Sequence, residues 1–267
     1  MAIAEDFNFN SINISIGDLE VRLAENNVEI DAAQALRYKV FFEEMKAKPT
    51  KNQNKIKRDY DGFDYYFDHI LVIDHSRAGQ LSDKVVGTYR LNRGNYKEKQ
   101  NFYYTSNEYD LSNLFTYDGN LLELGRSCVD SKYRNGKTMQ LLWKFIAQYV
   151  IKHNIKIMFG CASFPGINLN VHKYALAYLY EKYLAPINIR PKAVKDRFIE
   201  MKDSKLYDAN FKNFLNSIPP LIKGYIRLGA FVGNGAVIDH QFNTVDVCIV
   251  LPTDKVASRY MHHYERT

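Results

Sequence analysis

The sequence predicts an α+β fold, with a mixed central sheet that is mostly antiparallel and flanked by helices. Residues 121–161 alternate as strand, turn, helix and strand, a unit that places its two strands parallel in one sheet. The strands expected at 69–74 and 85–91 are joined by a polar turn, which favours an antiparallel hairpin. The chain has 267 residues, enough for one large core, and no linker or repeat divides it. We therefore expect one domain over residues 1–267.

The N-terminal third predicts one helix and one hairpin. Apolar residues recur at helical spacing after Asp31, the expected N-cap, so a helix should run to about residue 46. Residues 46–58 carry six basic residues and no acidic one, and we expect a solvated, mobile loop or a docking surface for an acidic ligand. After an acidic, aromatic run at 59–68, strands are expected at 69–74 and 85–91.

The middle of the chain contains the strand–helix–strand unit and a polar insertion. Residues 92–120 are rich in tyrosine and are expected to be an insertion with a short helix at 111–115. A strand is expected at 121–129, a turn at 130–136, a strongly periodic helix at 137–153 and a buried strand at 155–161.

The C-terminal part predicts further helices and two closing strands. A helix is expected at 169–183, with shorter helical pieces at 194–201 and 211–215 inside a second insertion, residues 185–219. The prolines at 219–220 should break this pattern, and strands are expected at 224–231 and 244–251.

Composition excludes several classes of protein. The chain is 46% hydrophobic, so it is not disordered, and nowhere do about 18 apolar residues run without a charge, as an integral membrane protein requires. Three scattered cysteines predict a reducing, cytoplasmic setting without a disulfide framework. The 36 basic and 30 acidic residues give a net charge of +6, which predicts anionic partners.

Three motifs fail on inspection. Gly136, Lys137 and Thr138 resemble the end of a phosphate-binding loop, but Ser131 stands where its first glycine belongs. A helix start that binds one phosphate, or simple capping, is the better interpretation. Ser163 lacks the flanking glycines of a hydrolase nucleophile, and the seven histidines show no ligand spacing, so no metal site is expected.

Six blocks of sequence, in the same order, resemble the ornithine N-acyltransferases that make lyso-ornithine lipid, a family once labelled hemolysin-like. The blocks are AAQALRYKVFFEEM (32–45), DYDGFDYYFDHILVID (59–74), VVGTYRL (85–91), LELGRSCVDSKYRNGKTMQLLWKFIAQY (122–149), GCASFPG (160–166), and IPPLIKGYIRLGAFVG with DHQFNTVDVCIVL (218–251). The resemblance implies the GNAT acyltransferase fold, whose central parallel strands splay around the pantetheine arm of an acyl thioester.

The resemblance also implies a reaction. A long, 3-hydroxylated acyl chain would pass from acyl carrier protein to the α-amine of ornithine, the first step of ornithine-lipid synthesis. No cofactor would be bound, since the thioester on the carrier's phosphopantetheine is a co-substrate. Glycine or another amino acid is the alternative acceptor. A lactone-forming synthase and a non-enzymatic basic module that binds membrane surfaces or nucleic acid are rival interpretations.

More distantly, the chain is similar to acyl-homoserine-lactone synthases. The shared residues are Arg37, Phe41, Asp59, Asp61, Asp64, Arg90, Glu123 and Arg126. In those synthases the acidic run and the Glu/Arg pair form the amine-binding and catalytic region. The resemblance therefore implies catalytic roles for Glu123, Asp61 and Asp64.

Chemistry supports these residue types. An ammonium must lose a proton before its nitrogen attacks a thioester, and Glu123 is the candidate base, directly or through a water. Strand alternation places Glu123 on one face and Arg126 on the other, unless a bulge changes the phase. A glutamate paired with an arginine is the alternative.

The remaining candidates would hold the substrates. An arginine guanidinium can form two parallel hydrogen bonds to the carboxylate of the acceptor, and acidic side chains can bind its ammonium. The alternative is that these residues form ordinary ion pairs with one another at the strand ends. The acceptor candidates are Arg37, Phe41, Asp68, Arg90 and Arg126. Asp61, Asp64 and Asp68 would hold the ammonium of the acceptor, or its distal amine if it is ornithine. The donor candidates are Val129, Arg134, Gly136, Lys137 and Thr138, and the backbone N–H groups near 128–130 are the expected oxyanion donors.

The excess positive charge is concentrated in two segments, residues 46–58 and a helix expected at 190–205. Acyl carrier protein, which is small and strongly acidic, is the expected partner for both. Peripheral contact with the inner membrane face is also expected, and nucleic acid is not.

Overall fold

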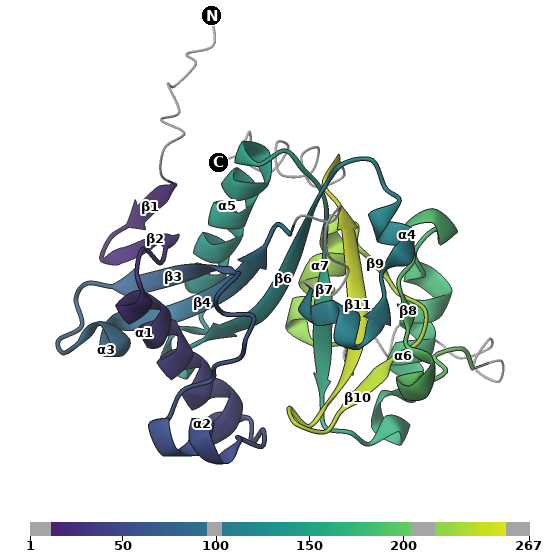
Figure 1. Cartoon of the computed structure of the whole chain (residues 1–267), viewed down its shortest axis with the longest axis horizontal. Helices are drawn as coiled ribbons and strands as arrows, with labels where there is room; N and C mark the ends of the chain where they lie inside the picture. Colours follow the sequence, from purple (N-terminus) through teal and green to yellow (C-terminus); the bar gives the residue numbers. More distant parts are fainter. Residues whose placement is uncertain (1–11, 95–102, 204–216, 255–267) are drawn as a thin grey trace, which may run out of the picture.

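A mixed sheet forms the centre of the molecule. The computed structural model describes residues 12–94, 103–203 and 217–254. Neighbouring strands are antiparallel except β6 and β7. The order across the sheet is β1 (Asn13–Ile16), β2 (Leu19–Leu23), β3 (Asp68–Asp74), β4 (Val85–Asn92), β6 (Asn120–Val129), β7 (Ile155–Pro165), β11 (Thr244–Pro252) and β10 (Val237–Asp239), with β9 (Phe231–Val232) also on β11 (Figure 1).

The parallel pair confirms the predicted strand–helix–strand unit. Strand β6 leads through a turn into α5 (Lys137–Lys152), which returns the chain to β7 beside β6. Buried residues such as Phe145 and Tyr149 face the sheet at helical spacing. The expected α+β fold, with one parallel pair in a mostly antiparallel sheet, is therefore present.

The two parallel strands separate part of the way along. Their pairing ends at Glu123 and Phe159, although β6 runs on to residue 129 and β7 to residue 165. Beyond that point β6 stays with β4 while β7 stays with β11, so the ribbons diverge in Figure 1. Gly160 lies at the separation point, where a Cβ atom would stand 2.1 Å from the Leu124 carbonyl oxygen. The expectation of splayed strands is confirmed.

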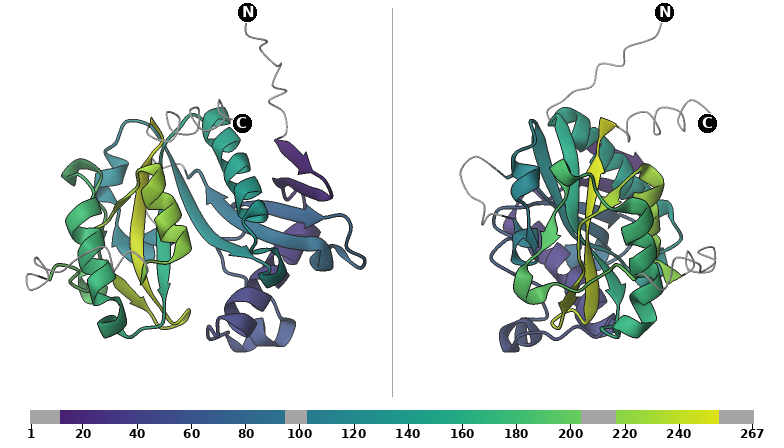
Figure 2. Two further views of the ribbon diagram at one scale, coloured as in Figure 1. Left: turned by 180° about the vertical axis from the view of Figure 1, so that it is seen from behind. Right: turned by 90° about the vertical axis from the view of Figure 1, so that its right-hand side faces the viewer.

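Helices and insertions cover opposite faces of the sheet. Helices α5, α6 (Leu169–Tyr183) and α7 (Pro220–Leu228) pack into one large apolar core on the first face (Figure 2). Helix α1 (Asn27–Tyr38), extended by a π-helical turn (Lys39–Glu44), and the two insertions pack on the second face. Within the described residues no helix is long and apolar enough to span a bilayer.

Several expectations about helix starts were wrong. The N-cap of α1 is Asn26, whose side chain accepts from the Glu29 N–H, and Asp31 lies inside the helix. Residues 46–58 are not a plain loop, because Thr50 and Gln53 form a capping box that starts α2 (Lys51–Ile56). A short helix, α3 (Leu81–Lys84), also precedes β4.

The C-terminal third departs further from expectation. The strand expected at 224–231 is mostly helix α7, because proline at the first helical position starts a helix rather than ending one, and Gly229 closes it with φ of 99°. The helix expected at 190–205 is not found over residues 190–203, the part of it that the structure describes: these residues contain β8 (Lys192–Ala193) and one 3₁₀ turn (Lys195–Arg197). The helical piece expected at 211–215 lies outside the described residues.

The two insertions pack against each other. The first contains a 3₁₀ turn (Tyr104–Asn107), β5 (Tyr109–Asp110) and α4 (Ser112–Phe115), the last confirming the short helix expected at 111–115. Strand β5 pairs with β8, and the Val194 N–H donates to the Glu108 carbonyl over 2.9 Å. Together they cover β7 and β11 on the second face.

Candidate active site

Arg37 organises the first part of the site. From α1 its Nε atom donates to Asp59 Oδ2 at 2.9 Å, and its two terminal nitrogens donate to both oxygens of Asp64 at 2.9 and 2.8 Å. The guanidinium is completely buried. Burial alone would raise the pKa of Asp64, but Arg37 and then Arg90 hold that pKa well below its usual value. The Asp64 carboxylate is therefore ionised throughout the physiological range.

Two strand arginines complete the network. Arg90 on β4 donates through Nη1 to Asp61 at 2.7 Å and to Asp64 at 2.9 Å. Arg126 on β6 donates to Asp59 and Asp61, each at 3.2 Å. Each of the three aspartates is thus shared between two arginines, and the six charges cancel. We call these six residues the Arg–Asp network.

A bulge in β6 turns Arg126 toward this network. The register between β4 and β6 shifts between Thr88 and Arg90, and Arg126 has φ of 50°. Strict alternation would have placed Arg126 on the face opposite Glu123. The bulge instead brings both residues to the second face. The prediction that Glu123 and Arg126 lie on opposite faces is therefore wrong, and the stated exception, a bulge that changes the phase, applies.

Aromatic rings enclose the arginines. The ring of Phe67 lies 4.5 Å from the Arg90 guanidinium, and those of Tyr104 and Phe242 lie 4.7 and 4.4 Å from that of Arg126. Nothing in the sequence singled out Phe242, because a loop between β10 and β11 brings it here. Burial raises the pKa of Tyr104 to about 12, so its hydroxyl remains protonated.

Glu123 lies on the same face but holds the first insertion. Its carboxylate oxygens accept from the backbone N–H groups of Tyr104 at 3.1 Å and Thr105 at 2.6 Å. No ion pair joins it to an arginine among the residues described, so the paired alternative is not found there. The side chain is 1% exposed, and burial raises its pKa. A raised pKa suits a proton acceptor, and its role as the base stays a prediction.

Two acceptor candidates lie apart from the Arg–Asp network. The Phe41 ring packs edge-on against Phe242, 5.7 Å between centroids, and so supports the aromatic enclosure. Asp68 points to the first face, where it accepts from the Tyr149 hydroxyl and lies 3.6 Å from Arg93. The structure therefore does not bring Asp68 together with Asp61 and Asp64.

The donor candidates gather where β6 meets α5. Arg134 donates to the Val129 carbonyl at 3.0 Å and pairs with Glu44. Gly136, with φ of 90°, leads into Lys137 at the start of α5. The Lys137 N–H donates to the Asn135 side chain at 3.1 Å.

Thr138 and the end of β6 define the close approach between helix and sheet. Thr138 is fully buried, and its methyl group would lie 2.8 Å from a Cβ atom at Gly87. The Asp130 N–H donates to Val86 and is not available as an oxyanion donor. By alternation, the Val129 N–H points to the opposite edge of β6, toward the side that β7 has left.

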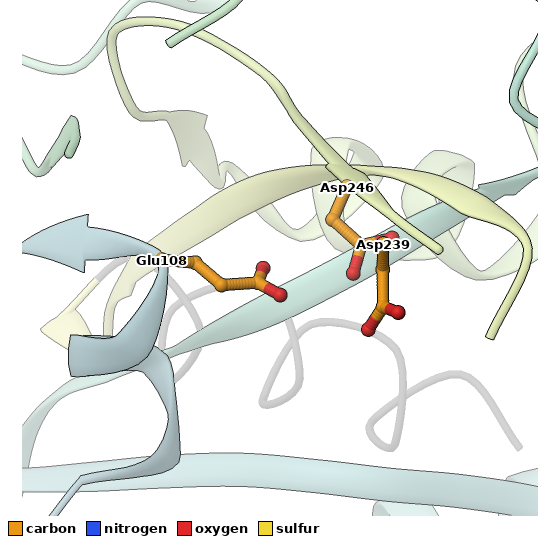
Figure 3. Close-up of side chains that lie close together, drawn as sticks. All are labelled: Glu108, Asp239 and Asp246. Carbon is orange, nitrogen blue, oxygen red and sulfur yellow. The ribbon is translucent and has the colours of Figure 1, made fainter. Parts of the chain in front are cut away.

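A second polar cluster was not foreseen. Glu108, Asp239 and Asp246 come from the first insertion, β10 and β11, and their carboxylate oxygens lie within 4.8 Å of one another (Figure 3). All three are buried. We call them the carboxylate cluster. Its members are too far apart in sequence to form a motif, so only the tertiary fold brings them together.

The carboxylate cluster predicts an unusual pH dependence of stability. Burial raises the pKa of Glu108 to about 7 and that of Asp246 to about 6, whereas both ionise near pH 4 in an unfolded chain. Between about pH 4 and 7 the folded state therefore binds more protons, and these groups make stability fall as the pH rises. We expect Glu108→Gln to flatten the decline of the melting temperature across this range. An unchanged slope in that variant would contradict the prediction.

Comparison with known proteins places the chain in a family. The family model of the acetyltransferase (GNAT) domain matches residues 36–144. The L-ornithine Nα-acyltransferase of Agrobacterium fabrum (strain C58) is 45% identical over 251 residues, covering 93% of this chain and 86% of that protein. The one from Rhizobium meliloti (strain 1021) is 44% identical over 260 residues, covering 93% and 85%.

Solved structures were compared as well. That of FeeM, an N-acyl amino acid synthase from uncultured soil microbes, has a TM-score of 0.49 and 10% identity, covering 90% of this chain and 93% of that one. From the identity to the curated relatives over most of both chains, this chain belongs to the L-ornithine Nα-acyltransferase family and is an acyltransferase.

Proposed function

We propose that this acyltransferase moves a long acyl chain from the phosphopantetheine thioester of acyl carrier protein to the α-amine of ornithine, forming a lyso-aminolipid. The observation that carries the proposal is the separation of β6 from β7 beside the Arg–Asp network. The names of the relatives support ornithine as the acceptor. Transfer from acyl carrier protein and a place in lipid synthesis are our inference.

Arg126 is the arginine best placed to bind the carboxylate of the acceptor. Arg37 and Arg90 each expose 1% of their side chains, whereas Arg126 exposes 11%. The aromatic rings of Tyr104 and Phe242 limit its movement. A planar guanidinium held in this way can form two parallel hydrogen bonds to a carboxylate.

The reaction then needs a base and an oxyanion donor. Glu123 takes the proton from the α-ammonium, directly or through a water, and the free amine attacks the thioester carbonyl. The Val129 N–H faces the separated edge of β6 and stabilises the oxyanion. Attack forms the C–N bond and gives the tetrahedral oxyanion. Its collapse breaks the C–S bond, and the thiolate of the carrier leaves as a thiol with the second proton lost by the attacking nitrogen, while the proton held by Glu123 passes to solvent.

The test is to incubate the enzyme with 3-hydroxyacyl carrier protein and an equimolar mixture of amino acids, and to identify the products by mass spectrometry. N-acylornithine should dominate. If acylglycine is the main product, glycine replaces ornithine as the acceptor in this proposal. The absence of any N-acyl amino acid above the level of the no-enzyme control would refute the proposal.

The carrier protein is expected to dock on α2. The side chains of Lys51 and Lys55 are exposed one helical turn apart, and the adjoining chain adds further basic residues. Reversing both charges to glutamate should raise the KM for acyl carrier protein at least about threefold at low salt, because complementary charge speeds association. Turnover at saturation should be unchanged.

The matched control is Lys173→Glu, on α6 at the other end of the molecule (Figure 1). Its KM for the carrier should stay at the wild-type value. A rise that is equal for each reversed charge in the two variants would assign the effect to net charge and not to docking on α2.

A further inference from the structure

We propose that the carboxylate cluster of Glu108, Asp239 and Asp246 binds the distal ammonium group of a diamino-acid acceptor. The inference rests on the proposed function, because it assigns the part of the site that would distinguish ornithine from an amino acid with an uncharged side chain. It also replaces the expectation that Asp61, Asp64 and Asp68 hold that amine.

The acidic run is not available for an ammonium. The six charges of the Arg–Asp network already cancel, and Asp61 and Asp64 each accept from two arginines. A cation placed there would have to displace a guanidinium from a buried ion pair, at a large cost. Asp68 is on the other face of the sheet.

The carboxylate cluster lacks such compensation. The only cation paired with it among the described residues is Arg197, 3.4 Å from one oxygen of Glu108. Glu108 Oε2 and Asp246 Oδ1 are buried, and no described group donates a hydrogen bond of good geometry to either. The Ser163 and Thr244 hydroxyls near Asp246 and the Cys161 thiol near Glu108 favour the charged carboxylates, but none of them carries a positive charge. Buried carboxylate oxygens without a donor are costly, and their presence indicates a ligand that donates hydrogen bonds. An ammonium group offers three such donors.

One oxygen of Asp239 has its partners already. Asp239 Oδ1 accepts from the backbone N–H groups of Gln241 at 2.7 Å and Phe242 at 2.9 Å. These bonds fix the loop that carries Phe242 against Arg126. The same loop therefore joins the carboxylate cluster to the proposed carboxylate-binding arginine.

The location of the cluster fits an extended acceptor. Asp246 pairs in register with Ser163 on β7, beyond the point at Phe159 where β6 has left. Arg126 is close enough to Asp246 to stabilise its charged form. Tyr104, whose ring lies 4.7 Å from the Arg126 guanidinium, also interacts electrostatically with Glu108 and Asp239. An acceptor held at its carboxylate by Arg126 can then point its side chain at the cluster, which selects a charged terminus.

Acceptor discrimination tests this assignment. The acceptors are ornithine and norvaline, which has the same carbon chain without the distal amine. Wild-type enzyme should favour ornithine by more than about tenfold in kcat/KM, the effect of a buried charged hydrogen bond. Asp246→Asn and Glu108→Gln should remove this preference and leave kcat/KM for norvaline within about threefold of wild type. A merely structural role would lower both values together.

The matched control is Asp118→Asn, an exposed carboxylate in the same insertion. It should retain the preference for ornithine. Equal use of both acceptors by the wild type, or an undiminished preference in the two cluster variants, would overturn the assignment. Loss of activity on adding EDTA, with recovery on adding Mg²⁺ or Ca²⁺, would make the cluster a metal site instead.

Thermal shift without acyl donor separates this inference from the proposed function. Ornithine should raise the melting temperature of the wild type and of Asp118→Asn more than norvaline does, and should not do so in Asp246→Asn. A missing ornithine shift in the wild type overturns the cluster assignment. A normal shift without any acylated product overturns the proposed reaction and leaves the ammonium site standing.

Discussion

Replacing Gly160 by alanine is expected to destabilise the protein by about 3 kcal/mol or more and to abolish acyl transfer. The new methyl group would stand 2.1 Å from the Leu124 carbonyl oxygen, so backbone has to move rather than a flexible side chain. That contact lies one residue beyond the last pair of the parallel strands. Any shift there changes the course of β6 past the Arg–Asp network and the Val129 N–H.

Urea unfolding and an acyl-transfer assay measure the two effects. Gly224→Ala is the control, because that glycine lies inside α7 and a Cβ atom there would touch nothing within 4 Å. It should stabilise the protein by up to about 1 kcal/mol, since alanine is the better helix former. Wild-type stability and activity in Gly160→Ala would show that the separation of the strands does not depend on this contact.

Arg37→Met is expected to cost about 3–5 kcal/mol of folding free energy, because it leaves two buried carboxylates each with one fewer partner. The methionine fills most of the volume but donates no hydrogen bond. Asp59 would keep only Arg126 as its ionic partner. Asp64 would keep Arg90 as its ionic partner and the Gln34 amide, 2.9 Å away, as a neutral donor. Acyl transfer should fall with stability, since the network positions Arg126.

Arg58→Met is the comparison variant, because Arg58 pairs with Asp31 on α1, the helix that also carries Arg37. Arg58 forms two hydrogen bonds of 2.8 Å to Asp31, but the Asp31 side chain is half exposed. An exposed pair of this kind is worth less than about 1 kcal/mol. Equal losses in urea unfolding for the two variants would mean that burial does not set the strength of the network.

Much of the fold follows from local pattern. The periodic apolar residues of α5 and the apolar runs of β3, β6 and β11 are long enough to fix element type without tertiary information. The parallel pair then follows from handedness and connection length. The segments that were missed or misassigned, such as β1, β2 and β10, are short and gain their stability from neighbouring strands.

The candidate site likewise contains residues that the sequence identifies and residues that only the tertiary structure brings together. Arg37, Asp61, Asp64, Arg90 and Arg126 stand out because they belong to the pattern shared with the acyl-homoserine-lactone synthases, and the structure joins all of them. The phase of Arg126 depends on a bulge that no residue pattern announces. The carboxylate cluster depends on three distant segments meeting, and a sequence without that tertiary information shows only isolated acidic residues.

The turn of residues 104–108 sets the distance between Glu123 and the carboxylate cluster. Its first two N–H groups are fixed by Glu123, and it ends at Glu108 in the carboxylate cluster. Covalent geometry of one short segment therefore sets how far the proposed base stands from the proposed ammonium site. Swapping side chains cannot lengthen that span; only adding or removing residues in the turn can. Acceptors one methylene longer or shorter than the preferred one should thus be distinguished by backbone length.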